Sequence, residues 1–202
     1  MARGGGWMSF HAGDAAGASS SSSSSSSAAS ESDPTVIELK PNMTGFHVLE
    51  LKPSANGRSL ELASQHTDRD RFNIYKDTDK ETRRFAKWVD ALPNGRVVMI
   101  CITDTAIAAK RPPGKMLYDS LVKLGASSKM ERIGYRFPFA MIGVKGSKEG
   151  SANLAMDKTK VLLRLEANIG VTSGKTSLED KSEERVNVTE LILAAERARE
   201  EA

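Results

Sequence analysis

Three side chains beside two apolar segments could bind a ligand. Asp104 follows the apolar run 97–102, and Tyr135 and Arg136 stand at the start of a second apolar run. A carboxylate accepts hydrogen bonds from hydroxyl groups, a guanidinium donates through a planar fork, and an aromatic ring offers a flat face. Together these groups suit a neutral polyhydroxylated ligand such as a sugar. The alternative is a structural Asp104–Arg136 ion pair that closes the end of a sheet, and these residues alone do not decide between the two.

The segment 135–146 supports two interpretations of its own. Arg136 leads an otherwise apolar run, which indicates either a strand end that opens on a binding surface or a core strand whose arginine reaches solvent. Gly143 and Gly146 surround a lysine near the end of the segment. Such paired glycines indicate backbone that turns tightly or approaches another group closely.

Apolar patterns along the chain define the strands that must position these residues. The run 97–102 is apolar on both faces, which predicts a central strand covered on both sides. Alternation in 45–51 and 59–63, joined by a turn that contains Asn56-Gly57, predicts a hairpin. The strands expected are 35–39, 45–51, 59–63, 96–103, 133–144 and 160–168, with a polar loop over 147–158.

Two amphipathic helices are expected between the strands. The first begins at a capping box formed by Thr78 and Glu81 and stops at the sequence Pro-Asn-Gly of 93–95. The second occupies roughly 115–124 and ends at Gly125.

Composition divides the chain into three regions. Residues 1–33 contain an unbroken serine run, 19–27, and too little apolar surface to offset the entropy of ordering, so we expect a disordered tail. The folded domain is expected over 34–169. A polar linker and a C-terminal amphipathic helix are expected over 170–202.

Composition also argues against several functional classes. The net charge is +3 with basic and acidic residues interleaved, and aromatic residues make up 5% of the chain, so no nucleic-acid partner is expected. The single cysteine, Cys101, is interpreted as a small buried hydrophobe, and the three histidines lack metal-ligand spacing. No stretch approaches the roughly 20 apolar residues of a membrane span. We therefore expect no cofactor, no metal and no membrane span.

The sequence Gly170-Val-Thr-Ser-Gly-Lys-Thr176 resembles a phosphate-binding loop but has three residues, not four, between its first glycine and Gly-Lys. The polar residues after it do not suit the buried helix that such a loop requires, so we expect no nucleotide site.

The first eleven residues lack the continuous apolar core of a signal peptide, which favours a cytoplasmic location. If a segment precedes this N-terminus, the secretory pathway or the extracellular space is expected instead.

An ordered set of segments resembles one protein family. These segments are 45–51, Leu92-Pro-Asn-Gly-Arg-Val-Val-Met-Ile100, Thr103-Asp104, Leu121-Val-Lys-Leu-Gly125, and Tyr135-Arg136 through Gly143-Val-Lys-Gly146. The set covers roughly residues 35–169. It is similar to the interleukin-like EMT inducer domain, also called the PANDER-like or GG domain, and in particular to the stem domain of protein O-mannose beta-1,2-N-acetylglucosaminyltransferase.

The resemblance implies a compact single α/β domain with two mainly antiparallel β-sheets and flanking helices. It also implies a sugar site, because the transferase stem holds a β-linked N-acetylglucosamine with an aspartate and an arginine that correspond to Asp104 and Arg136. A further sugar-contacting arginine of that stem falls on Thr44 here, so one charged donor worth about 1.5–3 kcal/mol per hydrogen bond is lost. The polar and indole side chains that follow the family's arginine become Phe137 and Phe139.

These expectations lead to one function and one alternative. The first is a non-catalytic carbohydrate-binding module for β-linked N-acetylglucosamine-type glycans, with Asp104 and Arg136 as contacts and Tyr135 as a stacking residue. Its partner would be a glycan or glycoprotein. The alternative is a protein-interaction or cytokine-like signalling module with no glycan site. We do not expect an enzyme, because catalysis in the transferase belongs to a separate domain.

Overall fold

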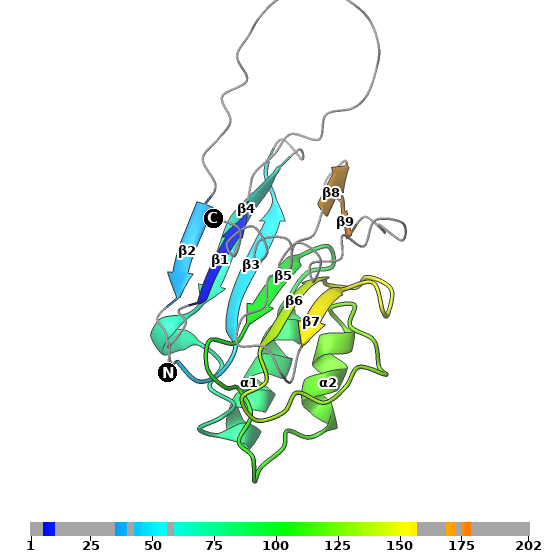
Figure 1. Ribbon diagram of the computed structural model, residues 1–202. Coiled ribbons are helices and arrows are strands. Elements are labelled where there is room, and N and C mark those ends of the chain that lie inside the picture. Colours follow the sequence, from blue (N-terminus) through cyan, green and yellow to red (C-terminus); the bar gives the residue numbers. More distant parts are fainter. Residues whose placement is uncertain are drawn as a thin grey trace, which may run out of the picture.

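A five-stranded antiparallel sheet forms the centre of the molecule. The structure is a computed structural model that describes residues 6–10, 35–39, 43–55, 59–156, 169–172 and 175–178. The strand order is β4-β3-β5-β6-β7 (Figure 1). The bounds are β3 His47–Pro53, β4 Leu60–His66, β5 Val97–Cys101, β6 Phe139–Val144 and β7 Asn153–Met156. The predicted hairpin of 45–51 and 59–63 is confirmed as β3 and β4, and β5 is the central strand, as its apolar run predicts.

The expected second sheet is not found among the described residues. Two short antiparallel pairs accompany the main sheet instead: β1 (Gly6–Phe10) with β2 (Thr35–Leu39), and β8 (Ile169–Thr172) with β9 (Lys175–Leu178). The strand β1 falls inside the range 1–33 that the sequence assigns to a tail; the other residues of that range lie outside the described ones.

The glycine-lysine segment near the C-terminus pairs with itself. Thr172 lies opposite Lys175 in the β8–β9 pair, so Lys175 begins a strand in place of the helix that a phosphate loop requires. Thr176 of β9 donates its hydroxyl to the carbonyl of Gly95, which ties this pair to the turn before β5. The strand expected over 160–168 and the helix expected over 189–202 lie outside the described residues.

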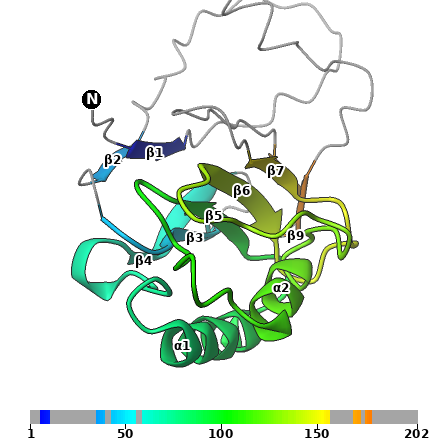
Figure 2. The ribbon, with the colours of Figure 1, turned by 60° about the horizontal axis from the view of Figure 1, so that its bottom comes forward.

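Both helices lie on the same face of the sheet (Figure 2). They are α1 (Thr78–Ala91) and α2 (Lys115–Val122), each close to its predicted range. The start of α1 differs in detail from the predicted capping box. Asp77, one residue before Thr78, is the N-cap, and its carboxylate accepts from the Lys80 N–H at 3.1 Å. The Glu81 carboxylate instead accepts from the Asn73 N–H at 3.0 Å, across the loop that leads into the helix.

Aromatic rings fill the layer between the helices and the sheet. Phe46 stacks on Phe139 with ring centroids 5.9 Å apart and meets the edge of Phe85 at 5.6 Å. Phe72 meets Phe85 at 5.1 Å in a second edge-to-face contact. All four rings are buried, so this cluster anchors α1 to the strands on either side of the candidate site.

The segment after α2 departs from its predicted form in two places. The strand expected over 133–144 begins only at Phe139, and β7 lies inside the loop expected over 147–158. The paired glycines behave as the sequence predicts. A Cβ on Gly143 would meet the Leu124 carbonyl oxygen at 2.2 Å, and Gly146 has φ +78°. Close approach and a tight turn therefore explain these two glycines.

Candidate functional site

The candidate residues lie at one end of the sheet, where two loops meet. Cys101 at the end of β5 pairs with Ala140 near the start of β6 and with His47 at the start of β3. Antiparallel pairing therefore brings the loop 102–107, which leaves β5, beside the segment 133–138, which enters β6.

Thr105 joins these two segments. Its hydroxyl accepts a hydrogen bond from the Arg136 main-chain N–H at 3.1 Å and donates to the Ile107 carbonyl at 3.1 Å. Its own carbonyl accepts from the Gly45 N–H at 2.7 Å. Asp104 directly precedes Thr105 and Tyr135 directly precedes Arg136, so this bond places the main-chain segments of the three predicted site residues next to each other.

Arg136 occupies a turn rather than the head of a strand, which corrects the sequence-based interpretation. It lies three residues before β6, and the Phe137 N–H bonds to the Gly134 carbonyl across the turn at 3.4 Å. Its φ of 58° places a non-glycine residue in the left-handed region, at a cost of about 1–2 kcal/mol. Strain of this kind gathers at functional sites, where surrounding contacts maintain it.

The charged and aromatic groups of this turn face solvent. The Tyr135 side chain is 41% exposed and Arg136 is exposed as well. The Arg136 guanidinium carbon lies 5.3 Å from the centroid of the Tyr135 ring, within the range of a cation–π contact. Phe139, by contrast, is buried in the core, so it is no part of a ligand surface.

Asp104 is half-buried in the loop after β5. No hydrogen bond or ion pair joins its carboxylate to the Arg136 guanidinium in the part of the chain that the structure describes. The structural Asp104–Arg136 ion pair, which the residues alone left open, is therefore not formed, and both side chains keep their polar groups for other partners.

A buried histidine lies beneath this end of the sheet, and no pattern in the sequence indicated its role. His47 is fully buried, with Nε2 3.3 Å from the Thr103 hydroxyl oxygen and 3.5 Å from the Met43 carbonyl. The Thr103 hydroxyl itself donates to the Met43 carbonyl at 2.9 Å. These partners assign the proton to Nε2 and leave Nδ1 buried without a partner among the described residues.

Burial sets the protonation states of His47 and of the neighbouring Cys101. Burial lowers the pKa of His47, and the positive charge of Arg71 lowers it further, against the opposing effects of the Met43 carbonyl and Asp68. Burial also raises the pKa of the Cys101 thiol to about 12. Cys101, opposite His47 across the strands, is therefore a neutral thiol and not a nucleophile, as its apolar neighbours in the sequence suggested.

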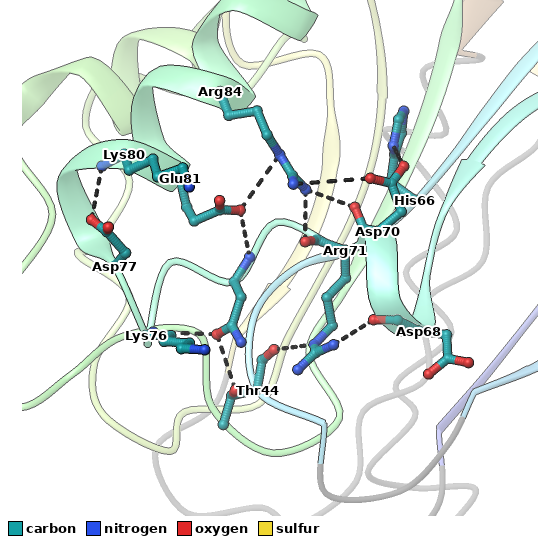
Figure 3. Close-up of polar contacts among 11 residues, drawn as sticks. Thr44, His66, Asp68, Asp70, Arg71, Lys76, Asp77, Lys80, Glu81 and Arg84 are labelled. Carbon is teal, nitrogen blue, oxygen red and sulfur yellow. Dashed lines mark hydrogen bonds and ion pairs between the residues drawn. The ribbon is translucent and has the colours of Figure 1, made fainter.

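Two arginines stabilise the loop between β4 and α1, which packs against Thr44 (Figure 3). Arg71 donates from Nε to the Thr44 carbonyl at 2.6 Å, and the Thr44 hydroxyl donates to the Asn73 side-chain oxygen at 3.0 Å. Arg84 reaches from α1 to the main-chain carbonyls of Asp70 and Arg71, at 2.6 and 2.7 Å. Pattern reasoning missed both arginines, because their partners lie 13 to 27 residues away in the chain.

Within the described ranges, no cluster of three or more His, Cys, Asp or Glu side chains could hold a metal ion. In the same ranges, no helix is long and apolar enough to cross a lipid bilayer.

A known protein family matches the part of the chain that contains the candidate site residues. Positions 45–147, about half of the 202 residues, match the family described as interleukin-like EMT inducer. The chain belongs to the interleukin-like EMT inducer family. The match to this family begins at Gly45, whose N–H bonds to Thr105, and it includes Asp104, Tyr135 and Arg136.

Two curated relatives are similar to part of this member of the interleukin-like EMT inducer family. The human and mouse proteins called "Cell migration-inducing and hyaluronan-binding protein" are each 30% identical to the chain over 82 residues. The similarity covers 41% of this chain and 6% of the length of each relative.

Proposed function

We propose that this chain is a non-catalytic carbohydrate-binding module for glycans that contain β-linked N-acetylglucosamine. The supporting observation is the Thr105–Arg136 hydrogen bond, which joins the turn of the exposed Tyr135 and Arg136 to the loop that contains the half-buried Asp104. The missing Asp104–Arg136 ion pair supports the same proposal, because groups that satisfied each other would have little left to offer a ligand.

Each group has a role that fits its chemistry. The Asp104 carboxylate accepts from sugar hydroxyl or amide N–H groups, and the Arg136 fork donates to hydroxyl, carbonyl or carboxylate oxygens. The Tyr135 ring packs against the apolar face of a sugar ring. Its contact with the Arg136 guanidinium keeps the two groups on one surface.

The relatives' name directs the choice of ligand. Hyaluronan alternates β-linked N-acetylglucosamine with glucuronate, so it presents both the acetamido sugar and a carboxylate that an arginine can bind through two parallel hydrogen bonds. We therefore propose a hyaluronan oligosaccharide as the first ligand, and neutral chito-oligosaccharides as the comparison that isolates the contribution of charge.

We propose no catalytic step at this site, and the number of its acidic groups supports that choice for glycoside hydrolysis. Glycoside hydrolysis ordinarily uses a pair of carboxyl groups on opposite sides of the scissile bond. In the two loops 102–107 and 133–138 the sole carboxylate is Asp104. One acid beside an arginine serves recognition better than bond cleavage.

Calorimetric titration with a hyaluronan hexasaccharide tests the proposal. We expect saturable binding by the wild type and a loss of at least tenfold in affinity for Arg136→Ala. Arg132→Ala is the matched control, because Arg132 is also exposed and lies four residues earlier, with its guanidinium over the Tyr118 ring at 6.0 Å. Absence of binding to this ligand and to chitotriose would reject the function, and equal binding by Arg136→Ala would reject the site.

A second candidate function, protein interaction, is favoured by a shallow groove between α1 and α2. Arg83 and Lys87 of α1 line it beside Met116 of α2, whose side chain is 47% exposed. The other charged groups that line the groove are paired, Lys123 with Asp90 and Asp119 with Lys115. A partner captured by the wild type but not by Arg83→Glu/Lys87→Glu would support this candidate, and capture unaffected by these changes would reject it.

A further inference from the structure

We infer that Thr105 is the positioning residue of the ligand site, and that its hydroxyl sets the direction in which the Arg136 guanidinium projects. This inference rests on the proposed function for the role of Arg136. It concerns a residue that touches no ligand itself, because Thr105 is only 3% exposed.

The hydrogen-bond pattern leaves the Thr105 hydroxyl no freedom. Its single proton is donated to the Ile107 carbonyl at 3.1 Å, so an oxygen lone pair is directed at the Arg136 N–H, also at 3.1 Å. A hydroxyl can donate and accept in this way, whereas a valine of the same shape can do neither. Among side chains of this size, serine alone could replace it.

The Arg136 backbone needs such support. Its φ of 58° is disfavoured for a residue with a Cβ, and without an acceptor for its N–H the residue would relax toward negative φ. That rotation would swing the Cα–Cβ bond, and with it the guanidinium, away from its present direction. The hydrogen bond that the Arg136 N–H donates to Thr105 and the strain at Arg136 are of similar energy, so we expect removal of the bond to release the turn.

Thr105 also fixes the site to the sheet. Its carbonyl accepts from the Gly45 N–H at 2.7 Å, at the residue before the bridge between Phe46 and Phe72. Gly45 has φ +107°, and a Cβ there would meet the Phe72 carbonyl oxygen at 2.5 Å. Contacts with closely packed main chain thus fix the position of Thr105. The hydrogen bond to its hydroxyl then fixes the main chain of Arg136 relative to the sheet.

Two variants and one control test the inference. Thr105→Val removes the hydroxyl at constant shape, and Thr105→Ser keeps it. Thr82→Val is the control, because Thr82 is equally buried but its hydroxyl finds no partner among the described residues. Two measurements are made on each protein: hydrogen exchange of the Arg136 amide in the ligand-free state, and affinity for a hyaluronan hexasaccharide.

We expect Thr105→Val to accelerate exchange of the Arg136 amide and to weaken binding about tenfold, with Thr105→Ser and Thr82→Val close to wild type in both measurements. Wild-type affinity in a folded Thr105→Val protein would overturn the inference, as would an Arg136 amide that exchanges equally fast in wild type and Thr105→Val. If the wild type binds no hexasaccharide, the proposed function fails for this ligand, while the exchange measurement still decides whether Thr105 holds the turn. A Thr105→Val protein that does not fold shifts the test to Thr105→Ser, whose loss of protection and affinity would also overturn the inference.

Discussion

The main-chain N–H of Arg136 donates a 3.1 Å hydrogen bond to the hydroxyl of Thr105, which lies 31 residues earlier in the chain. This bond connects the loop after the central strand with the turn before β6, and it holds an arginine in the left-handed region of backbone conformation. The exposed groups beside it, and not the sheet itself, carry the function proposed for this chain.

Substitution of Arg136 by glycine separates binding from stability. Glycine tolerates the φ of 58° without strain, which stabilises the folded state. Glycine also loses more conformational entropy on folding, which costs about 0.5–1 kcal/mol, so the two effects nearly cancel. We predict a free energy of unfolding within about 1 kcal/mol of wild type and a loss of at least tenfold in affinity for the hexasaccharide. Urea unfolding and calorimetry measure the two quantities. A large loss of stability would assign Arg136 a structural role instead.

Asp104→Asn keeps the shape of the side chain and removes its charge. Because no ion pair joins Asp104 to Arg136 in the described part of the chain, we predict an unchanged melting temperature. Affinity should fall about tenfold, since a hydrogen bond to a charged group is worth about 1.5–3 kcal/mol. A melting temperature several degrees lower, with affinity intact, would contradict this assignment.

His47 makes the fold sensitive to mild acid. Its pKa in the folded protein is lowered by burial from the ordinary value of 6.5, so below about pH 6.5 the unfolded chain takes up a proton that the folded chain refuses. Stability is therefore fully present above this pH and declines as the pH falls toward the lowered folded pKa. We predict that His47→Gln flattens the slope of melting temperature between pH 7.5 and 5.5. His66→Gln is the control, and an unchanged slope in His47→Gln would exclude this source of the acid sensitivity.

Arg84 stabilises the loop that precedes α1. Its guanidinium donates to the carbonyls of Asp70 and Arg71, lies 3.5 Å from the Glu81 carboxylate, and covers the Phe72 ring at 4.6 Å. We predict that Arg84→Met lowers the free energy of unfolding by about 1–3 kcal/mol, because two main-chain acceptors lose a charged donor. Urea denaturation measures the change.

The neighbouring arginine provides the control for this prediction. Arg83 is exposed and points toward the groove between the helices, so Arg83→Met should change stability by less than about 0.5 kcal/mol. Equal effects of the two substitutions would show that Arg84 acts through general charge and not through its contacts.

Local patterns were sufficient to predict most of the sheet and both helices. Alternation predicted β3 and β4, and a run with two apolar faces predicted β5 as the central strand, because burial on both faces leaves no polar positions. Gly125, with φ +92°, ends the α2 segment where a C-terminal glycine is expected. Membership of the interleukin-like EMT inducer family was also predicted, from the order of the matching segments.

Long-range contacts account for what the sequence did not predict. The apolar residues Phe137 and Phe139 made 133–144 look like one strand, whereas pairing with β5 begins only at Phe139. The short strand β7 has a weak pattern of its own and forms because β6 offers it an edge. Asp104 and Arg136 remain predictions that rest on their chemistry, and Thr105 was missed because its bond spans 31 residues and leaves no periodic signal.

A nuclear magnetic resonance titration of the ¹⁵N-labelled chain with a hyaluronan hexasaccharide tests directly whether the loops 102–107 and 133–138 bind the glycan. We predict saturable shifts of amides in 103–107 and 133–137, with little change along the groove between α1 and α2, and no saturable shifts in Arg136→Gly. Saturable shifts that cluster elsewhere, or that persist in Arg136→Gly, would contradict the site, and the absence of saturable shifts in the wild type would contradict hyaluronan as the ligand.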